Sequence, residues 1–89
     1  MNSEKNWVLQ IDSVVYKFLK KIPRRDAEGI LSAIESLPSD PFYGDIEKMK
    51  GEKHAWRRRV GSFRIFYELV PAEKIIHVVS VERRTSSTY

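Results

Sequence analysis

The dipeptide Gly61-Ser62 constrains the fold more than any other feature of this sequence. It separates two runs rich in strand-forming residues, "AWRRRV" and "FRIFYELV". A two-residue loop with glycine at its first central position is typical of a tight β-hairpin, because glycine tolerates the positive φ that such a turn requires. The hairpin places Val60 opposite Phe63, and the pairing of every residue further along the two strands follows from that contact.

This register sorts the side chains of the hairpin onto two faces, because successive strand residues point to opposite sides of a sheet. One face is apolar and is expected to be covered by helices. Its residues are Trp56, Val60, Phe63, Ile65, Tyr67 and Leu69. The other face carries Arg57, Arg59, Arg64 and Phe66. Arg58 falls on the apolar face, where its side chain must either extend past the helices or mark a bulge that alters the register.

Two amphipathic helices precede the hairpin, because apolar residues recur at helical spacing in two successive stretches. They are Val14, Val15, Phe18, Leu19 and Ile22 in the first stretch, and Ala27, Ile30, Leu31, Ile34 and Leu37 in the second. Asp12 or Ser13 suits the N-cap of the first helix, and Pro23 suits the first turn of the second. Gly29 costs its helix about 1 kcal/mol relative to alanine, so we expect it to permit close packing.

Two further strands complete the predicted sheet. The segments "WVLQI" at 7–11 and "KIIHVVSVE" at 74–82 are short, apolar and rich in strand formers. The segment 38–45, "PSDPFYGD", is expected to be a loop, and the segment 71–73 a turn. The sequence therefore predicts an α+β fold, in which an N-terminal helical hairpin packs on one face of a mainly antiparallel four-stranded sheet.

Length and composition restrict the class of protein. The 89 residues form one domain, 1–89, because a core of this size cannot be divided and stay stable. The absence of cysteine excludes a disulfide framework and a cysteine nucleophile. No segment reads as a signal peptide or a bilayer span, so we expect a soluble, cytoplasmic protein without a membrane partner. The net charge of +4 favours an anionic partner such as nucleic acid.

The arginines of the open face allow two interpretations. Arg59 opposite Arg64 is a like-charge pair, which destabilises a sheet, and a bound anion would relieve the repulsion. Alternatively, the guanidinium groups extend into water and pair with Glu68 or Glu47, as most exposed charges do. We favour anion binding, because three arginines and an aromatic residue converge on the open face of a small basic domain.

Several segments together carry a resemblance to a known family. They are "KMKG" at 48–51, "WRRRVGSFRIFYEL" at 56–69, "IIHVVSVERR" at 75–84 and the terminal Tyr89. With the helical hairpin before them, they resemble the RelE/ParE superfamily of bacterial toxins, the toxic halves of type II toxin–antitoxin pairs. Members of the RelE branch are ribosome-dependent endoribonucleases that cut messenger RNA in the decoding site. Their fold is a helical hairpin on a curved antiparallel sheet, so the resemblance implies an mRNA interferase that inhibits translation.

The resemblance also implies a set of site residues. The cleavage site of the RelE branch resembles a basic pair spaced by one residue, an arginine in the next strand, an arginine beyond the last strand and a C-terminal tyrosine. In this sequence these are Arg57, Arg59, Arg64, Arg84 and Tyr89, with Arg83 as the alternative to Arg84. The residues expected to contact RNA are Lys48, Lys50, Arg83 and Phe66.

The implied reaction is attack by the 2′-hydroxyl of the RNA, without a metal or cofactor. Guanidinium groups would stabilise the negative charge that builds on the phosphorus oxygens, but arginine cannot readily act as a base. Tyr89 would be a base only if nearby cations lower its pKa, and would otherwise stack on a nucleobase. We interpret His54 as a surface residue and His77 as a structural one, since neither has a catalytic partner or metal-site spacing.

Two other functions stay open. The ParE branch has a similar fold and inhibits DNA gyrase by binding, and a degenerate toxin would act only in a regulatory complex with its antitoxin. The cationic cluster and Tyr89 favour the RelE branch. The expected partners are a cognate antitoxin, the ribosome and messenger RNA, and the toxin–antitoxin complex is expected to bind operator DNA through the antitoxin.

Overall fold

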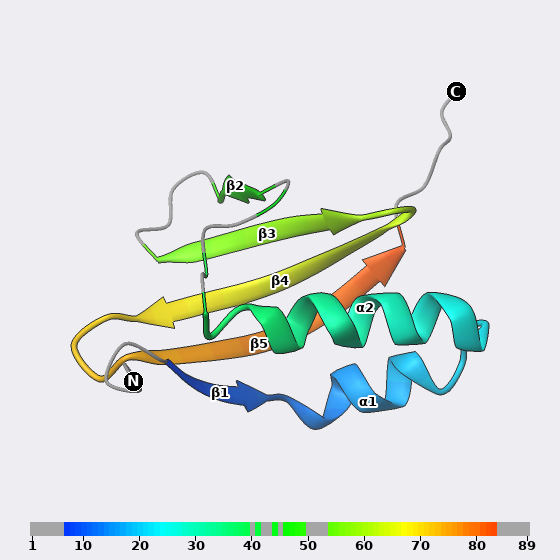
Figure 1. Ribbon diagram of the computed structural model, residues 1–89, viewed down its shortest axis with the longest axis horizontal. Coiled ribbons are helices and arrows are strands. Elements are labelled where there is room, and N and C mark those ends of the chain that lie inside the picture. The colour runs from blue at the N-terminus through cyan, green and yellow to red at the C-terminus, as the bar shows by residue number, and fades with distance from the viewer. Residues whose placement is uncertain (1–6, 40, 42–43, 45, 50–53, 84–89) are drawn as a thin grey trace.

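Two helices cover one face of a five-stranded sheet in the computed structural model, which describes residues 7–39, 41, 44, 46–49 and 54–83 (Figure 1). The elements in chain order are β1 (Val8–Ile11), α1 (Ser13–Leu19), α2 (Arg24–Ser36), β2 (Ile46–Lys48), β3 (Ala55–Val60), β4 (Phe63–Val70) and β5 (Ile75–Arg83). The strand order is β1-β5-β4-β3-β2, with β1 parallel to β5 and every other pair antiparallel. The predicted α+β class and mainly antiparallel sheet are confirmed.

The predicted number of strands is wrong by one. Four strands were expected, and the additional one is β2, which pairs antiparallel with β3 at the edge of the sheet. It has only three residues, "IEK", two of which are charged and exposed. A segment this short and polar has no alternation of apolar residues, which is the pattern that predicts a strand from sequence.

The β3–β4 hairpin has the predicted register. Val60 pairs with Phe63, Arg59 with Arg64 and Arg57 with Phe66. Gly61 has φ +58, as a two-residue hairpin turn requires at its first central position. The irregularity in the sheet lies between β4 and β5 at Phe66/Tyr67, beyond this turn.

The helical hairpin forms as predicted, with one correction. Asp12 caps α1, since its Oδ1 accepts a hydrogen bond from the backbone N–H of Val14 at 2.9 Å. Pro23 stands at the N-cap of α2, directly before the first helical turn. The expectation that Gly29 permits close packing is wrong, because no atom would lie within 4 Å of a Cβ built there, apart from its chain neighbours and the helix's own backbone.

The core lies between the helices and the apolar face of the sheet. Its members are Val15, Ile30, Ala33, Ile34, Leu37, Phe63, Ile65, Tyr67, Leu69, Ile76, Val78 and Val81. Tyr67 is 1% exposed, and its hydroxyl donates a hydrogen bond to the carbonyl oxygen of Pro41 at 2.6 Å. The helices therefore cover the face that sequence predicted, which leaves the arginine face of β3 and β4 open. No helix among the described residues is long and apolar enough to cross a bilayer.

Candidate functional site

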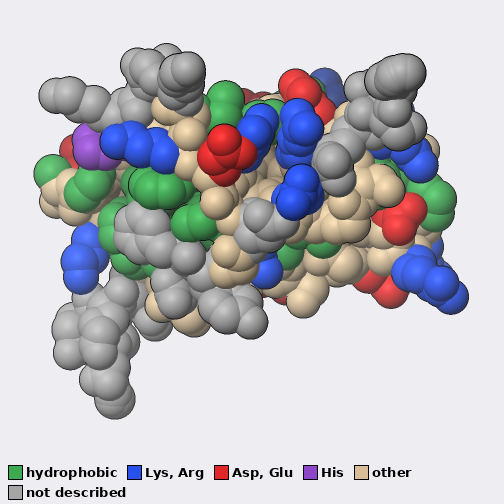
Figure 2. Space-filling model, turned by 90° about the horizontal axis from the view of Figure 1, so that it is seen from above, with side chains coloured by type: hydrophobic (Ala, Val, Ile, Leu, Met, Phe, Trp, Pro, Cys, Tyr) green, Lys and Arg blue, Asp and Glu red, His purple; other side chains and the backbone are tan. Residues whose placement is uncertain are grey.

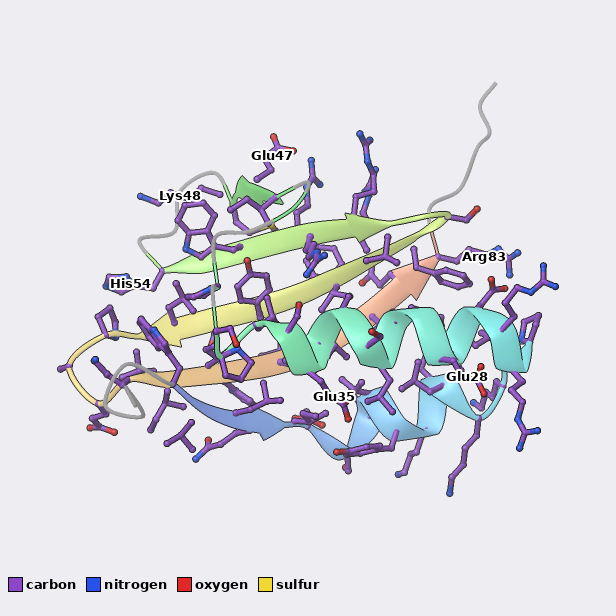
Figure 3. All side chains as sticks on the ribbon, in the orientation of Figure 1. Glu28, Glu35, Glu47, Lys48, His54 and Arg83 are labelled. Carbon is purple, nitrogen blue, oxygen red and sulfur yellow. The ribbon has the colours of Figure 1, made fainter. Side chains whose placement is uncertain are left out.

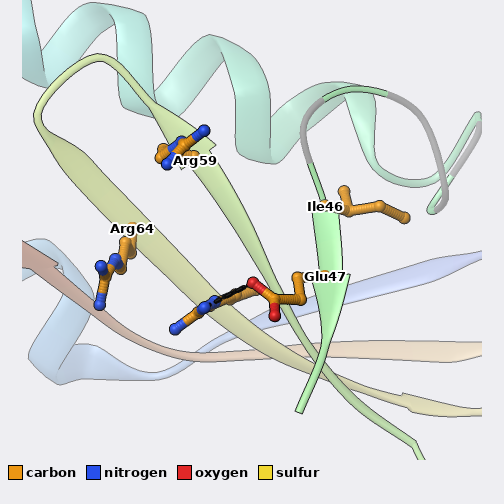
Figure 4. Close-up of a pocket in the computed structure, with 5 residues that line it drawn as sticks. Ile46, Glu47, Arg59 and Arg64 are labelled. Atoms are coloured by element: carbon orange, nitrogen blue, oxygen red, sulfur yellow. Dashed lines mark hydrogen bonds and ion pairs between the residues drawn. The ribbon is translucent and has the colours of Figure 1, made fainter.

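Three arginines converge on the open face of the sheet. Arg57 and Arg59 lie two residues apart on β3, and Arg64 lies on β4 directly opposite Arg59. Together with Ile46 and Glu47 of β2 they line a hollow of about 170 Å³, which we call the arginine hollow (Figure 4). Figure 2, seen from the side where β2 and β3 lie, shows basic side chains gathered around an acidic one.

Arg57 is held by a carboxylate. The β2–β3 pairing places Glu47 opposite Arg57, and both Nε and Nη2 of the guanidinium donate hydrogen bonds to Oε1 of Glu47. The Nε bond is 3.2 Å long, and the side chains of Arg57 and Glu47 are 31% and 66% exposed. The alternative interpretation of the arginines therefore holds for Arg57 with Glu47. It does not extend to Glu68, whose carboxylate instead lies 3.8 Å from Nδ1 of His77.

Arg64 differs from Arg57 in its surroundings. It is half-buried on β4, and its side chain makes no hydrogen bond or ion pair with any residue that the structure describes. Arg64 has two cross-strand neighbours. Arg59 on β3 is also cationic, so the two guanidinium groups repel each other, whereas Glu82 on β5 is acidic but forms no ion pair with Arg64. An anion that entered the hollow would meet Arg64 without first displacing a carboxylate from it.

Arg58 fastens the arginine-bearing strand to the helices. Its side chain is on the apolar face, as predicted, and Nη1 donates hydrogen bonds to the carbonyl oxygen of Ala33 at 3.3 Å and to Oγ of Ser36 at 3.1 Å. A cation near the last carbonyls of a helix is favourable. The β3–β4 register is regular at Arg58, so of the two predicted possibilities the side chain extends toward the helix. Arg58 also lies against the loop before β2, since a Cβ at Gly44 would be 2.7 Å from its Nε.

The other residues predicted to contact RNA are scattered. Phe66 lies on the open face, opposite Arg57. Lys48 is exposed on β2 at the position paired with Trp56, which belongs to the face under the helices. Arg83 is also on that side, with its Cζ 5.2 Å from the centre of the Phe63 ring. Figure 3 shows Lys48 and Arg83 far apart, toward opposite ends of the sheet.

None of the remaining predicted residues that the structure describes lines the arginine hollow. Lys50, Arg84 and Tyr89 lie outside the described residues. His54 is exposed just before β3 (Figure 3), and His77 lies on the open face beside Glu68. Within the described ranges, no group of three or more His, Asp or Glu side chains could hold a metal ion.

The position of Glu47 in the arginine hollow was not predicted from the sequence. It was considered only as a surface partner for arginine, because the strand that carries it was not predicted. Pairing of β2 with β3 aligns Glu47 with Arg57, and this pairing continues into the bond from the N–H of Met49 to the carbonyl of Ala55 at 2.8 Å. Glu47 precedes Arg57 by ten residues in the sequence, which is close enough for the two to pair. The sequence alone does not specify how the segment between them brings Glu47 back to β3.

Comparison with known proteins covers nearly the whole chain. A family described as the ParE toxin of the type II toxin–antitoxin system, parDE, matches residues 8–87. The RelE1 protein of Methanocaldococcus jannaschii is 30% identical over 79 residues, which are 85% of this chain and 88% of that protein.

Solved structures resemble the fold over a similar extent. The RelE–RelB complex of Pyrococcus horikoshii OT3 matches with a TM-score of 0.80 at 22% identity, over 92% of this chain and 99% of that one. The RelB–RelE antitoxin–toxin complex from Methanococcus jannaschii matches with a TM-score of 0.69 at 26% identity, over 83% of this chain and 88% of that one.

Proposed function

Because this chain belongs to the RelE/ParE superfamily of type II toxins, we propose that it inhibits translation by cutting messenger RNA on the ribosome. The observation that carries the proposal is the arginine hollow, where Arg57, Arg59 and Arg64 line one cavity on the open face of the sheet. A fold of this kind needs no such cluster for its stability, since Arg59 and Arg64 repel each other. Glu47 offsets one of the three positive charges, and a phosphodiester would bring negative charge to the other two.

In this mechanism the 2′-hydroxyl of the RNA attacks the adjacent phosphorus, and the bond to the 5′-oxygen of the next nucleotide breaks. Charge builds on the non-bridging oxygens in the transition state. Arg64, which forms no ion pair with a described carboxylate, provides the strongest stabilisation of that charge, with Arg59 beside it. Arginine is suited to this role because it stays protonated and its planar fork matches a phosphate.

Glu47 is the group we assign to accept the proton of the 2′-hydroxyl. It is the carboxylate that lines the arginine hollow among the described residues, and Arg57 holds one of its oxygens in place. A positioned carboxylate is a common general base. The family resemblance implies Arg84 and Tyr89 as further site residues. We propose that Tyr89, rather than acting as the base, gives its proton to the leaving 5′-oxygen, and that Arg84 is a further cation at the phosphate.

Replacement of Glu47 by glutamine tests this assignment. Glutamine keeps the shape and can still accept a hydrogen bond from Arg57, but it cannot take up a proton. We expect Glu47→Gln to lower the single-turnover cleavage rate on ribosomes by about a hundredfold or more. Glu35→Gln, on the exposed side of α2, is the matched control. A Glu47→Gln variant as fast as wild type, or faster, would mean that the carboxylate only competes with RNA for Arg57.

Dependence on the ribosome follows from the shape of the site. The arginine hollow is small, about 170 Å³, and lies on one face of the sheet, so we infer that it can bind a phosphate but does not by itself hold the 2′-hydroxyl, phosphorus and leaving oxygen in line. Alignment of reacting groups contributes a large part of a rate enhancement. We therefore expect messenger RNA on ribosomes to be cut efficiently and the same RNA free in solution to be cut poorly.

A second candidate function is inhibition of DNA gyrase by binding, because the matching family is described as the ParE toxin. Expression of the chain in cells, followed by mapping of messenger RNA ends and of plasmid topology, separates the two. Cuts within translated codons support the ribonuclease. Intact messages with altered supercoiling or damaged DNA would instead support the gyrase inhibitor.

The cytoplasmic partners in this proposal are the ribosome, messenger RNA and a cognate antitoxin. Both solved relatives described above are complexes of a RelE protein with a RelB protein, which supports an antitoxin of that type. We further propose that the toxin–antitoxin complex binds operator DNA through the antitoxin. A gel-shift assay with the upstream DNA of the pair, with and without the toxin, tests this last step.

A further inference from the structure

A second hollow lies on the open face directly beside the arginine hollow. It has a volume of about 390 Å³, and its lining includes Met49, Ala55, Phe66, Glu68, Ser80 and Glu82. Most of these are open-face positions of β3, β4 and β5, and Phe66 is half-buried with its ring available to the hollow. We call it the Phe66 hollow.

Residues that line the Phe66 hollow are adjacent, along a strand or across a strand pair, to residues that line the arginine hollow. Phe66 pairs with Arg57, Ala55 is two residues before Arg57, and Glu82 pairs with Arg64. Same-face positions two residues apart on a strand are about 7 Å apart, which is the scale of a single nucleotide. A nucleotide whose phosphate contacts the arginines therefore has its base within reach of Phe66.

The sheet is also irregular at this place. Pairing between β4 and β5 shifts between Phe66 and Tyr67, so that Phe66 pairs with Ser80 while Tyr67 pairs with Val78. The shift leaves one additional residue, Val79, on β5 beneath the hollow. Bulges of this kind commonly redirect side chains beside functional sites.

The lining of the Phe66 hollow includes strong hydrogen-bond acceptors. Two carboxylates, those of Glu68 and Glu82, stand at its edge, and the hydroxyl of Ser80 can serve either way. Glu82 makes no hydrogen bond or ion pair with any residue in the described part of the chain. Exposed carboxylates beside a site for polyanions would repel RNA unless they contact donor groups of its bases.

We propose that the Phe66 hollow is a nucleobase site that selects bases bearing an exocyclic amino group over uracil. This inference rests on the ribonuclease activity proposed above. The base stacks on Phe66, and Glu82 accepts hydrogen bonds from the amino group of adenine, cytosine or guanine. Uracil has no amino group on that edge, and the two carbonyl oxygens that flank its N3–H are repelled by a carboxylate. The hollow thereby adds a sequence preference to a phosphate site that has none of its own.

The test is to map cleavage sites in a translation extract programmed with messages randomised at each codon position. Wild-type protein should disfavour uridine at one fixed position relative to the cut. Glu82→Gln should reduce that discrimination by about tenfold, since an amide can donate to a uracil carbonyl. Phe66→Ala should lower kcat/KM about fivefold or more for all four bases, because stacking is tolerant of sequence.

Two matched variants control for loss of charge and of an aromatic ring. Glu35→Gln on α2 and Tyr16→Ala on α1 are exposed and lie on helices across the core from the open face. Both should cut with wild-type rate and preference. Thermal melting of Phe66→Ala shows whether a lowered rate reflects partial unfolding. Phe66→Tyr, which keeps a ring for stacking, should recover most of the rate that Phe66→Ala loses.

The possible failures are distinguishable. If wild-type protein cuts messages but Glu82→Gln has the same uridine discrimination, the base site is wrong and the ribonuclease stands. If Phe66→Ala weakens only antitoxin binding, the hollow belongs to the antitoxin interface and the inference is overturned. If wild-type protein does not cut messages on ribosomes, the ribonuclease proposal fails and the base site falls with it.

Discussion

Five of the six arginines in the second half of the chain lie in the described residues, and they show how position decides the role of a single residue type. Arg57 is paired with Glu47, Arg58 is bonded to the end of α2, and Arg59 and Arg64 face each other across the open side of the hairpin. Arg83 is exposed on the helix side, above the Phe63 ring. Successive residues of a strand point to opposite faces of the sheet, and this alternation separates the roles of the arginines. The Gly61-Ser62 turn fixes the register, so the face of each arginine on β3 and β4 could be predicted from the sequence.

Arg83→Ala tests the role of the residue that sequence left as an alternative to Arg84. Its guanidinium lies over the Phe63 ring and away from the arginine hollow, so its removal should affect stability more than cleavage. We expect a loss of about 0.5–1 kcal/mol in the free energy of unfolding, as for an exposed cation–π contact. Cleavage on ribosomes should keep its wild-type rate. A large loss of cleavage with unchanged melting would return Arg83 to the RNA-contacting residues.

At the scale of elements, the quality of prediction followed the strength of the local pattern. The long runs of β3, β4 and β5 and the two apolar stripes of the helices were identified because each repeats its signal several times. The three-residue β2 was missed, and with it the contact between Glu47 and Arg57. This contact depends on a loop that brings an edge strand back to β3, and no short-range pattern specifies that return.

The assignment of faces makes a prediction for β4, the central strand of the sheet. Ile65 is fully buried under the helices, whereas Val70 at the end of the same strand is 38% exposed. We expect Ile65→Ala to cost about 2–5 kcal/mol of unfolding free energy, because it leaves a cavity in the core. The control Val70→Ala should cost much less. Chemical denaturation of both variants measures the difference, and equal losses would contradict the face assignment.

At the scale of the whole molecule, a helical layer covers one side of the sheet and the other side carries basic residues. The architecture was predictable because the apolar residues of helices and strands require each other as partners. The site was predictable only in part. The alternation of side chains along β3 and β4 predicted that Arg57, Arg59 and Arg64 share one face. The contact of Glu47 with Arg57, and the separation of Lys48 and Arg83 from the hollow, depend instead on how distant segments pair.

The open basic face makes a prediction for antitoxin binding. An antitoxin segment that supplies carboxylates to the arginine hollow would be steered by charge, so higher salt should slow association more than it speeds dissociation. Stopped-flow binding of the antitoxin at several ionic strengths measures both rates. An association rate that is indifferent to salt would contradict neutralisation of the arginines and favour steric occlusion of the site.

Replacement of Arg64 by alanine tests whether the arginine hollow stabilises the transition state of RNA cleavage. Arg64 lies on the open face, and its removal relieves repulsion with Arg59, so the variant should stay folded. Single-turnover cleavage of messenger RNA on ribosomes should fall about a hundredfold or more, while Arg25→Ala on the exposed surface of α2 should cut like wild type. A folded Arg64→Ala protein that cuts at the wild-type rate would show that the arginine hollow does not stabilise the transition state through Arg64.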